Sequence, residues 1–349
     1  MNREALVEAI GWGEVIQRRD LSGVDLKGAD LAGAVFEEVR FAGDQLHGAD
    51  LTESSLVSCD LSTCTLTGAT LRHTDFVRCD LRMTSFGSSD LTCTSFVEDD
   101  LTGARFEDTT LPIPVFMKCD LSRASFARSL LDRVRFLEVV TGELDLSKAE
   151  LRQVTFFQAD LSSAIFAEAR LFQTILSQCR FGARDLRGMS LAFCQLNGSD
   201  LRGADLREAD VHNAGFAGAD LRGAKLDDID ARSCLFDGAK LTGASLRGGS
   251  FRQALFVGAD LTAVDATGAD LYQATLERAS CRRARFVDTE LTYADFSHAD
   301  VSGADFTGAS LFRARFHRTL EDGAVLPRPN AALGDDERRA RAEDFAPSH

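Results

Sequence analysis

The stretch Gly28-Ala29-Asp30-Leu31-Ala32-Gly33-Ala34 decides the fold, because its pattern recurs every five residues along most of the chain. A centre, almost always Leu, Phe or Val, stands at every fifth position from Leu21 to Phe316, giving 60 consecutive positions without a break. A small residue usually stands two positions before each centre, Asp often stands one before it, and Gly often stands two after it. Internal repetition of this kind determines the fold before local propensities do.

The period of five fits neither an α-helix, with 3.6 residues per turn, nor a flat β-strand. The unit Ala-Asp-Leu-x-Gly resembles the repeat of the pentapeptide-repeat family over residues 19–318. This resemblance implies an all-β solenoid: a right-handed quadrilateral β-helix with four repeats per coil and about 15 coils. The chemistry agrees, because a large centre and a small residue two before it fill a narrow tube, and Gly suits a corner that needs φ > 0.

The chain divides into three predicted segments: a capping helix at 1–18, the β-helix at 19–318, and a linker with a flexible C-terminal tail at 319–349. Asn2 suits the N-cap of a helix from Arg3 to about Arg18. A solenoid end needs a cap because it exposes strand edges and an apolar mouth, although a partner-binding helix stays open as an alternative. Charged residues from Asp335 to Phe345 predict one exposed helix, either mobile or docked.

One predicted side of the tube is rich in phenylalanine. Eleven of its 15 centres, from Phe36 to Phe316, are Phe, whereas the side that begins at Leu31 has one. We expect a one-sided ladder of stacked rings in the core.

Three charged residues occupy the small inward slot: Asp44, Asp99 and Arg184. A charge inside the tube is costly unless it is paired. We therefore expect local bulges that turn these side chains outward; a functional notch is the alternative.

Two patches depart from the repeat chemistry without losing phase. Pro112 and Pro114 cannot donate backbone hydrogen bonds, and farther on Thr141 replaces an apolar centre while Leu144 fills a small slot. These patches predict a bend or a displaced corner.

Most of the nine cysteines occupy the small inward slot, where Cys behaves as a small apolar residue. We expect reduced thiols, no metal and no cofactor, and therefore a cytoplasmic protein. The segment from Met1 to Asp20 lacks the apolar core of a signal peptide. No apolar run approaches the ~18 residues of a membrane span.

The net charge of −15 is spread thinly, because many Asp residues are followed two positions later by Arg. We expect no direct nucleic-acid binding, since the sequence has no basic patch. The six histidines fit no metal-ligand or nucleophile pattern, so we expect no enzyme and no catalytic residues. His298 and His317 lie one predicted coil apart, and we interpret them as an incidental surface pair.

The feature that indicates a function is an outward apolar stripe on the Phe-rich side. The position just after the centre is apolar on six successive coils: Val57, Val77, Val97, Met117, Leu137 and Phe157. Val115 and Ile175 adjoin this stripe, which spans roughly 24 Å at ~4.8 Å per strand. Contiguous exposed apolar patches usually mark interaction sites, so these eight residues are the predicted partner-binding site, for a homodimer or another protein. Cover by the protein's own tail or N-terminal segment, and a simple β-propensity effect, stay open.

Two functions follow from these features. The first is a non-catalytic protein–protein interaction scaffold or adaptor; the run from Ala294 to Arg318 resembles pentapeptide proteins encoded beside bacterial type VI secretion components, which implies an accessory role there. The alternative, implied by resemblance to quinolone-resistance pentapeptide proteins, is a DNA-mimicking inhibitor or protector of a type II topoisomerase. The diluted acidity and the apolar stripe favour the scaffold, because a mimic needs a concentrated anionic surface.

Overall fold

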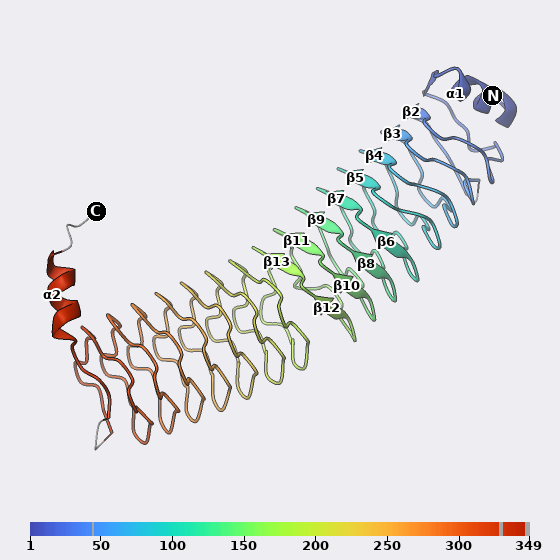
Figure 1. Ribbon diagram of the computed structural model, residues 1–349. Coiled ribbons are helices and arrows are strands. Elements are labelled where there is room, and N and C mark those ends of the chain that lie inside the picture. The colour runs from blue at the N-terminus through green and yellow to red at the C-terminus, as the bar shows by residue number, and fades with distance from the viewer. Residues whose placement is uncertain (44, 328–330, 346–349) are drawn as a thin grey trace. The chain divides into compact units, whose positions relative to one another are not determined.

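A computed structural model describes residues 1–43, 45–327 and 331–345 and divides the chain into two units, Met1–Cys179 and Arg180–His349. Parallel strands stack along the first unit, as Figure 1 shows from blue to green. The larger, nine-stranded sheet contains β1 (Val15–Gln17), β2 (Val35–Glu37), β3 (Ser55–Val57), β4 (Asp75–Val77), β5 (Ser95–Val97), β7 (Val115–Met117), β9 (Arg135–Leu137), β11 (Thr155–Phe157) and β13 (Ile175–Ser177). The four-stranded sheet contains β6 (Thr110–Pro112), β8 (Leu130–Asp132), β10 (Glu150–Arg152) and β12 (Arg170–Phe172).

The strand register fixes the length of one solenoid turn. Val57 pairs with Val77, and Val77 pairs with Val97, so each residue faces the residue 20 positions later. Single bridges repeat this spacing in the second unit, as between Asp200 and Asp220. Both units are therefore all-β solenoids, as the repeat predicts.

The core of the first unit contains stacked phenylalanine rings among its leucines. The rings of Phe96 and Phe116 stack with centroids 4.7 Å apart, and those of Phe106 and Phe126 form a second stack at 4.5 Å. The two ladders meet edge-to-face, with Phe106 and Phe116 at 5.8 Å and 89°. The expectation of a one-sided ladder is therefore wrong here, because two ladders fill the tube with the edge-to-face contacts that aromatic rings favour.

The corners place backbone in the left-handed region whether or not glycine is present. Gly33 has φ 68° and Glu98 has φ 58°. Their N–H groups donate to Thr52 O at 2.8 Å and Met117 O at 2.9 Å. This conformation costs a non-glycine residue roughly 1–2 kcal/mol, and the inter-rung hydrogen bond offsets part of that cost.

The N-terminal helix α1 (Arg3–Gly11) is shorter than the predicted helix that reaches Arg18. The Asn2 side chain caps it by accepting from Ala5 N at 3.0 Å. Gly13 then turns the chain at φ 74°, and Ile16 is buried at 3% exposure and pairs with Phe36. The solenoid therefore begins one repeat earlier than predicted, since Ile16 is the first centre of the ladder.

The C-terminal segment docks on the second unit. Backbone pairing extends past residue 318, because Arg315 bridges to Leu333. Helix α2 (Glu337–Phe345) follows, and Arg318 contacts Asp344 at 2.6 Å. Of the two expected arrangements, mobile or docked, the described residues of this segment adopt the docked one, in which opposite charges hold α2 against the solenoid.

The inward charged residues differ in their placement. Asp99 is buried at 2% exposure, so the predicted outward bulge is wrong. Its carboxylate accepts from Cys79 N at 2.6 Å and Val97 N at 3.0 Å, and these bonds offset part of the cost of burial. Burial raises the pKa of Asp99 to about 7. Arg184 is half-buried, and Asp44 lies outside the described residues.

The column of small inward slots that contains Asp99 also contains cysteines, and their thiols make hydrogen bonds. The Cys119 thiol donates to Phe96 O at 3.4 Å. The Cys79 thiol donates to Leu56 O at 3.3 Å. Cysteine here is therefore more than a small apolar residue, because its thiol donates a hydrogen bond to a carbonyl of the preceding rung.

The irregular patch at Thr141 keeps the register. Asp120 bridges to Val140, and Ser125 bridges to Asp145, with the usual spacing. The corner after Thr141 nevertheless departs from the usual pattern, because Glu143 N donates to the Ser163 hydroxyl at 3.1 Å, so the bend or displaced corner stays a prediction. Thr141 stays buried because its hydroxyl donates to the Asp160 carbonyl.

Candidate functional site

The predicted stripe lies on one face of the nine-stranded sheet, within the first unit. Its members occupy the last position of β3, β4, β5, β7, β9 and β11, and the parallel register places each beside the next. The residue between the two outward positions of each strand points into the core, as Phe96 and Phe116 do. The sheet therefore brings all six side chains into one outward row, as the sequence predicts.

Neighbours within the stripe partly cover one another. Met117 is 36% exposed, whereas Val97 and Leu137 are half-buried between flanking rungs. The stripe ends where Ser177 follows Phe157 in the register. It is thus a continuous apolar strip along the sheet face.

Val115 and Ile175 belong to a neighbouring row, at the first position of β7 and β13. Val115 shares its strand and its outward face with Met117, so it adjoins the stripe. Ile175 is 39% exposed, and Arg135 and Thr155 lie between it and Val115 in the register. The structure therefore brings Val115 to the stripe but leaves Ile175 at its end.

A charged rim borders the stripe on both sides, and sequence reasoning missed it. All six of its side chains are exposed: Asp75, Arg78, Glu98, Lys118, Arg135 and Glu138. None of the six forms an ion pair with any residue that the structure describes. Elsewhere on this unit charges do pair, as Arg82 does with Asp80 at 2.5 Å and Arg128 with Asp108 at 2.7 Å. The rim is therefore a set of available charges around an apolar row.

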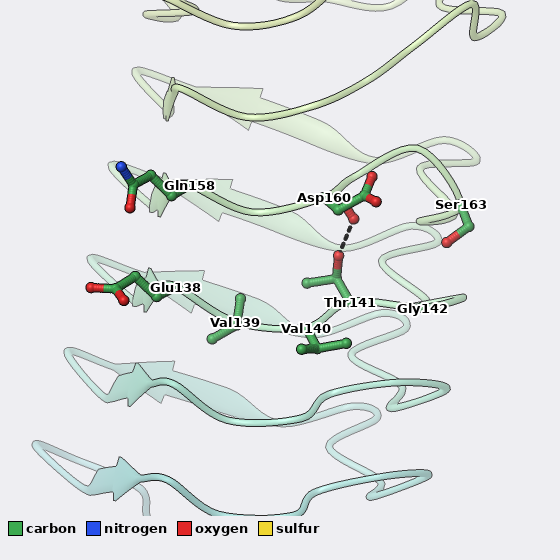
Figure 2. Close-up of a pocket in the computed structure, with 8 residues that line it drawn as sticks. All are labelled: Glu138, Val139, Val140, Thr141, Gly142, Gln158, Asp160 and Ser163. Atoms are coloured by element: carbon green, nitrogen blue, oxygen red, sulfur yellow. Dashed lines mark hydrogen bonds between the residues drawn. The ribbon is translucent and has the colours of Figure 1, made fainter.

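A shallow hollow of about 560 Å³ lies beside the stripe at the Thr141 patch (Figure 2). Figure 2 shows Thr141 bonded to Asp160 on the next rung, with Glu138 and Gln158 at the far end. Its lining contains no nucleophile paired with a base, which a catalytic site of that kind would need. The hollow marks the irregular centre at Thr141.

A second group of polar residues lies where α2 docks. His298 Nε2 and His317 Nε2 each lie 3.3 Å from a Glu343 oxygen, and His317 is 3% exposed. The interpretation of an incidental surface pair is therefore wrong. Arg339 Nε and Arg318 Nε approach the same carboxylate at 2.9 and 3.5 Å. Although burial alone would raise the pKa of Glu343, contacts with His317, Arg339 and His298 lower it to about 2.

Two histidines and a carboxylate could hold a metal ion, since their ligand atoms all lie within 4.8 Å of one another. Two guanidinium groups already bind this carboxylate, however, and would repel a cation. A comparable group, Asp210 with His212 and Asp230, is likewise engaged by Arg232, which pairs with Asp230 at 2.6 Å. The first group is better described as a polar clasp that holds the tail helix.

Sequence reasoning also missed a row of aromatic residues on the second unit. Tyr272 and Tyr293 have ring centroids 6.0 Å apart, and Phe312 continues the row at 6.0 Å. The Arg252 guanidinium lies 4.3 Å from the Tyr272 centroid. Tyr272 and Phe312 each follow a centre directly, and Tyr293 lies one position farther from its centre; the only two tyrosines of the chain lie here, which was a usable signal.

A membrane-crossing helix is not found within the described parts of the chain, where none is both long and apolar enough.

The chain was compared with proteins of curated description and with solved structures. No protein with a curated description matches the chain. Among solved structures, HetL, a pentapeptide repeat protein involved in heterocyst differentiation regulation from the cyanobacterium Nostoc sp. strain PCC 7120, is 25% identical, with 74% of this chain and 88% of HetL covered and a TM-score of 0.14. Full-length QnrB1, a plasmid-mediated fluoroquinolone resistance protein, is 17% identical, with 72% and 95% covered and a TM-score of 0.25. These low scores carry no argument about function.

Two family models match the repeats themselves. A pentapeptide repeat region model matches residues 29–106. A model of eight pentapeptide copies matches residues 143–178, 185–223, 214–253, 254–292 and 289–319. Together with the 20-residue register of both solenoid units, these matches show that the chain belongs to the pentapeptide-repeat family.

Proposed function

We propose that the protein is a non-catalytic interaction scaffold that binds a protein partner through the stripe. The observation that carries the proposal is the unbroken apolar row across six strands of a flat sheet face. Apolar rows of this size on a protein surface usually mark interaction sites. The charged rim supports this proposal, since interfaces combine an apolar centre with a polar edge.

Affinity capture from a lysate of the source cell tests the proposal. The wild type is compared with a variant that carries Val97→Asp and Leu137→Asp, both of which leave the inward centres unchanged. Ile165→Asp serves as a matched control, because Ile165 is an exposed apolar residue outside the stripe. A partner retained by the wild type and the control but lost by the double variant supports the proposal. Equal retention by all three proteins contradicts it.

The accessory role in type VI secretion remains a finer proposal. It is supported by the resemblance of the run from Ala294 to Arg318, and secretion components among the captured proteins would bear it out. The DNA-mimic alternative has less support, because Asp–Arg pairs such as Asp200 with Arg202, at 2.6 Å, neutralise much of the acidity. A gyrase that retains full supercoiling activity at micromolar protein would retire that alternative.

We also propose the number of sides, the number of coils and the handedness of the β-helix, and the cellular compartment of the protein. Four centres per 20-residue turn support a four-sided β-helix of about 15 coils, and membership of the pentapeptide-repeat family supports a right-handed one. The buried thiol of Cys281 supports a reducing bacterial cytoplasm, with no membrane or nucleic acid as partner. An experimental structure would test the handedness and the coil count.

A further inference from the structure

We infer that the partner of the stripe is a second copy of this chain, bound antiparallel about a two-fold axis between β5 and β7. This inference rests on the proposed function and identifies the partner of the same surface. A two-fold interface must be self-complementary, because the same patch meets itself. The sheet face can therefore be tested for self-complementarity residue by residue.

The geometry of such a pair follows from the strand order. When the two-fold axis runs parallel to the strands, each row of side chains faces the same row of the partner, but the partner's strands are stacked in the reverse order. β5 then faces the partner's β7, β4 faces the partner's β9, β3 faces the partner's β11, and β2 faces the partner's β13. Each row consequently meets its own reversed copy.

The apolar stripe is complementary to its reversed copy in size. Val97 meets the partner's Met117 in this arrangement. In the same way Val77 meets the partner's Leu137, and Val57 meets the partner's Phe157. Each small side chain faces a large one, so the gap between the two sheets stays even along the stripe. In the neighbouring row, Val35 meets the partner's Ile175, which gives the isolated exposed Ile175 an apolar contact.

The charged rim is complementary to its reversed copy in sign. Glu98 meets the partner's Lys118, and Arg78 meets the partner's Glu138. On the other side of the stripe, Asp75 meets the partner's Arg135. All the rim charges are thus matched, and the two-fold axis generates each pair twice.

The rim charges also lack partners within the described chain, although charges elsewhere on this unit are paired. Unpaired charges of alternating sign along one edge are what an electrostatically complementary interface requires. Antiparallel stacking gives every one of them an oppositely charged partner.

The size of the face sets the expected strength. Eight strands from β2 to β13 span about 34 Å at ~4.8 Å each, and four residues across span about 13 Å. The flat face is thus about 440 Å² per copy, which is below the ~800 Å² per partner of a standard stable interface. We therefore expect a weak dimer whose population depends on concentration in the micromolar range.

Charge exchange on the full-length protein tests the inference by sedimentation equilibrium. Glu98→Lys alone places Lys against the partner's Lys118, and Lys118→Glu alone places Glu against the partner's Glu98. Each reverses two symmetry-related contacts, so we expect the dimer Kd to rise about 30-fold, which is about 2 kcal/mol. The combined exchange restores attraction and should return Kd to near the wild-type value. Glu53→Lys is the matched control, because Glu53 has the same corner φ of 58° as Glu98 but lies on another side.

The outcomes separate the inference from the proposed function. Loss of dimer in both single variants with recovery in the combined exchange supports the antiparallel pair. A wild type that stays monomeric at about 200 µM, well above the expected micromolar range, or a combined exchange as weak as the singles, overturns it. In either case the scaffold proposal stands or falls separately, on whether Val97→Asp with Leu137→Asp abolishes capture of a different protein.

Discussion

Replacing the buried Asp99 by Ser changes the pH dependence of stability in a way that can be worked from its surroundings. Its pKa rises from 3.8 to about 7, chiefly because burial disfavours the charged form, while bonds from Cys79 N and Val97 N oppose the rise. Below pH 3.8 the carboxyl is protonated in both the folded and the unfolded chain. Between pH 3.8 and about 7 the folded protein keeps a proton that the unfolded chain has lost. The free energy of unfolding therefore falls as pH rises.

The magnitude follows from this interval. Each pH unit between the two pKa values costs about 1.4 kcal/mol, so wild-type protein loses up to about 4 kcal/mol from pH 4 to pH 8 through this group. The Asp99→Ser variant has no such loss, because a hydroxyl does not titrate in this range. Its hydroxyl can accept from Cys79 N, because Ser129 Oγ accepts from Thr109 N at 3.2 Å in an equivalent slot. The variant should therefore gain stability relative to wild type as pH rises.

Urea unfolding of both proteins at pH 4, 5, 6, 7 and 8 measures this difference. Asp108→Ser is the contrasting control, since its hydrogen bond with Arg128 lowers the pKa of Asp108. A lowered pKa contributes stability above the unfolded value, so this control should lose stability relative to wild type as pH rises through the acidic range. A difference between Asp99→Ser and wild type that stays flat from pH 4 to pH 8 would refute the reasoning.

Two further predictions concern the irregular patch and the tail. In urea unfolding, Thr141→Leu should lower the free energy of unfolding by about 1–3 kcal/mol through overpacking, and Leu144→Ala should lower it by about 2–5 kcal/mol because it leaves a cavity. The double variant restores the ordinary repeat, so it should lower the free energy of unfolding by clearly less than the sum of the two single effects. Strict additivity would show that the two sites do not compensate each other. Glu343→Gln should release α2 and speed tryptic cleavage within that helix. Glu337→Gln is the control, because it affects only a contact with Arg341 at 3.7 Å on the same helix, and it should not change the cleavage rate. Equal cleavage of the two variants would argue against the clasp.

The five-residue period predicted most of the fold because it constrains every turn independently of long-range contacts. Each centre from Leu21 onward needed only its own neighbours to be placed. Asp99 could not be placed in the same way, because the two N–H groups that hold it belong to Cys79 and Val97. The second phenylalanine ladder was visible as residues, but its edge-to-face contact with the first depends on the width of the tube.

The sequence predicted the parts of the candidate site whose residues recur every 20 positions, but it did not predict contacts between residues that share no regular spacing. The stripe follows from positions spaced by 20, so register alone brings Val57 and Phe157 into one row. The tail clasp joins His298 to Glu343, which lie 45 residues apart and share no period. The rim was overlooked because charged residues at corners look like ordinary solvated surface until their lack of ion pairs is known.

The mass of the full-length chain in solution, measured from about 5 to about 200 µM for wild type and Leu137→Asp, tests most directly whether the stripe is an interface between copies. We predict that wild-type mass rises from 37.9 kDa towards twice that value with concentration, while the variant remains at 37.9 kDa throughout. Wild-type mass that stays at 37.9 kDa over the whole range, or a variant that dimerises as the wild type does, would contradict it.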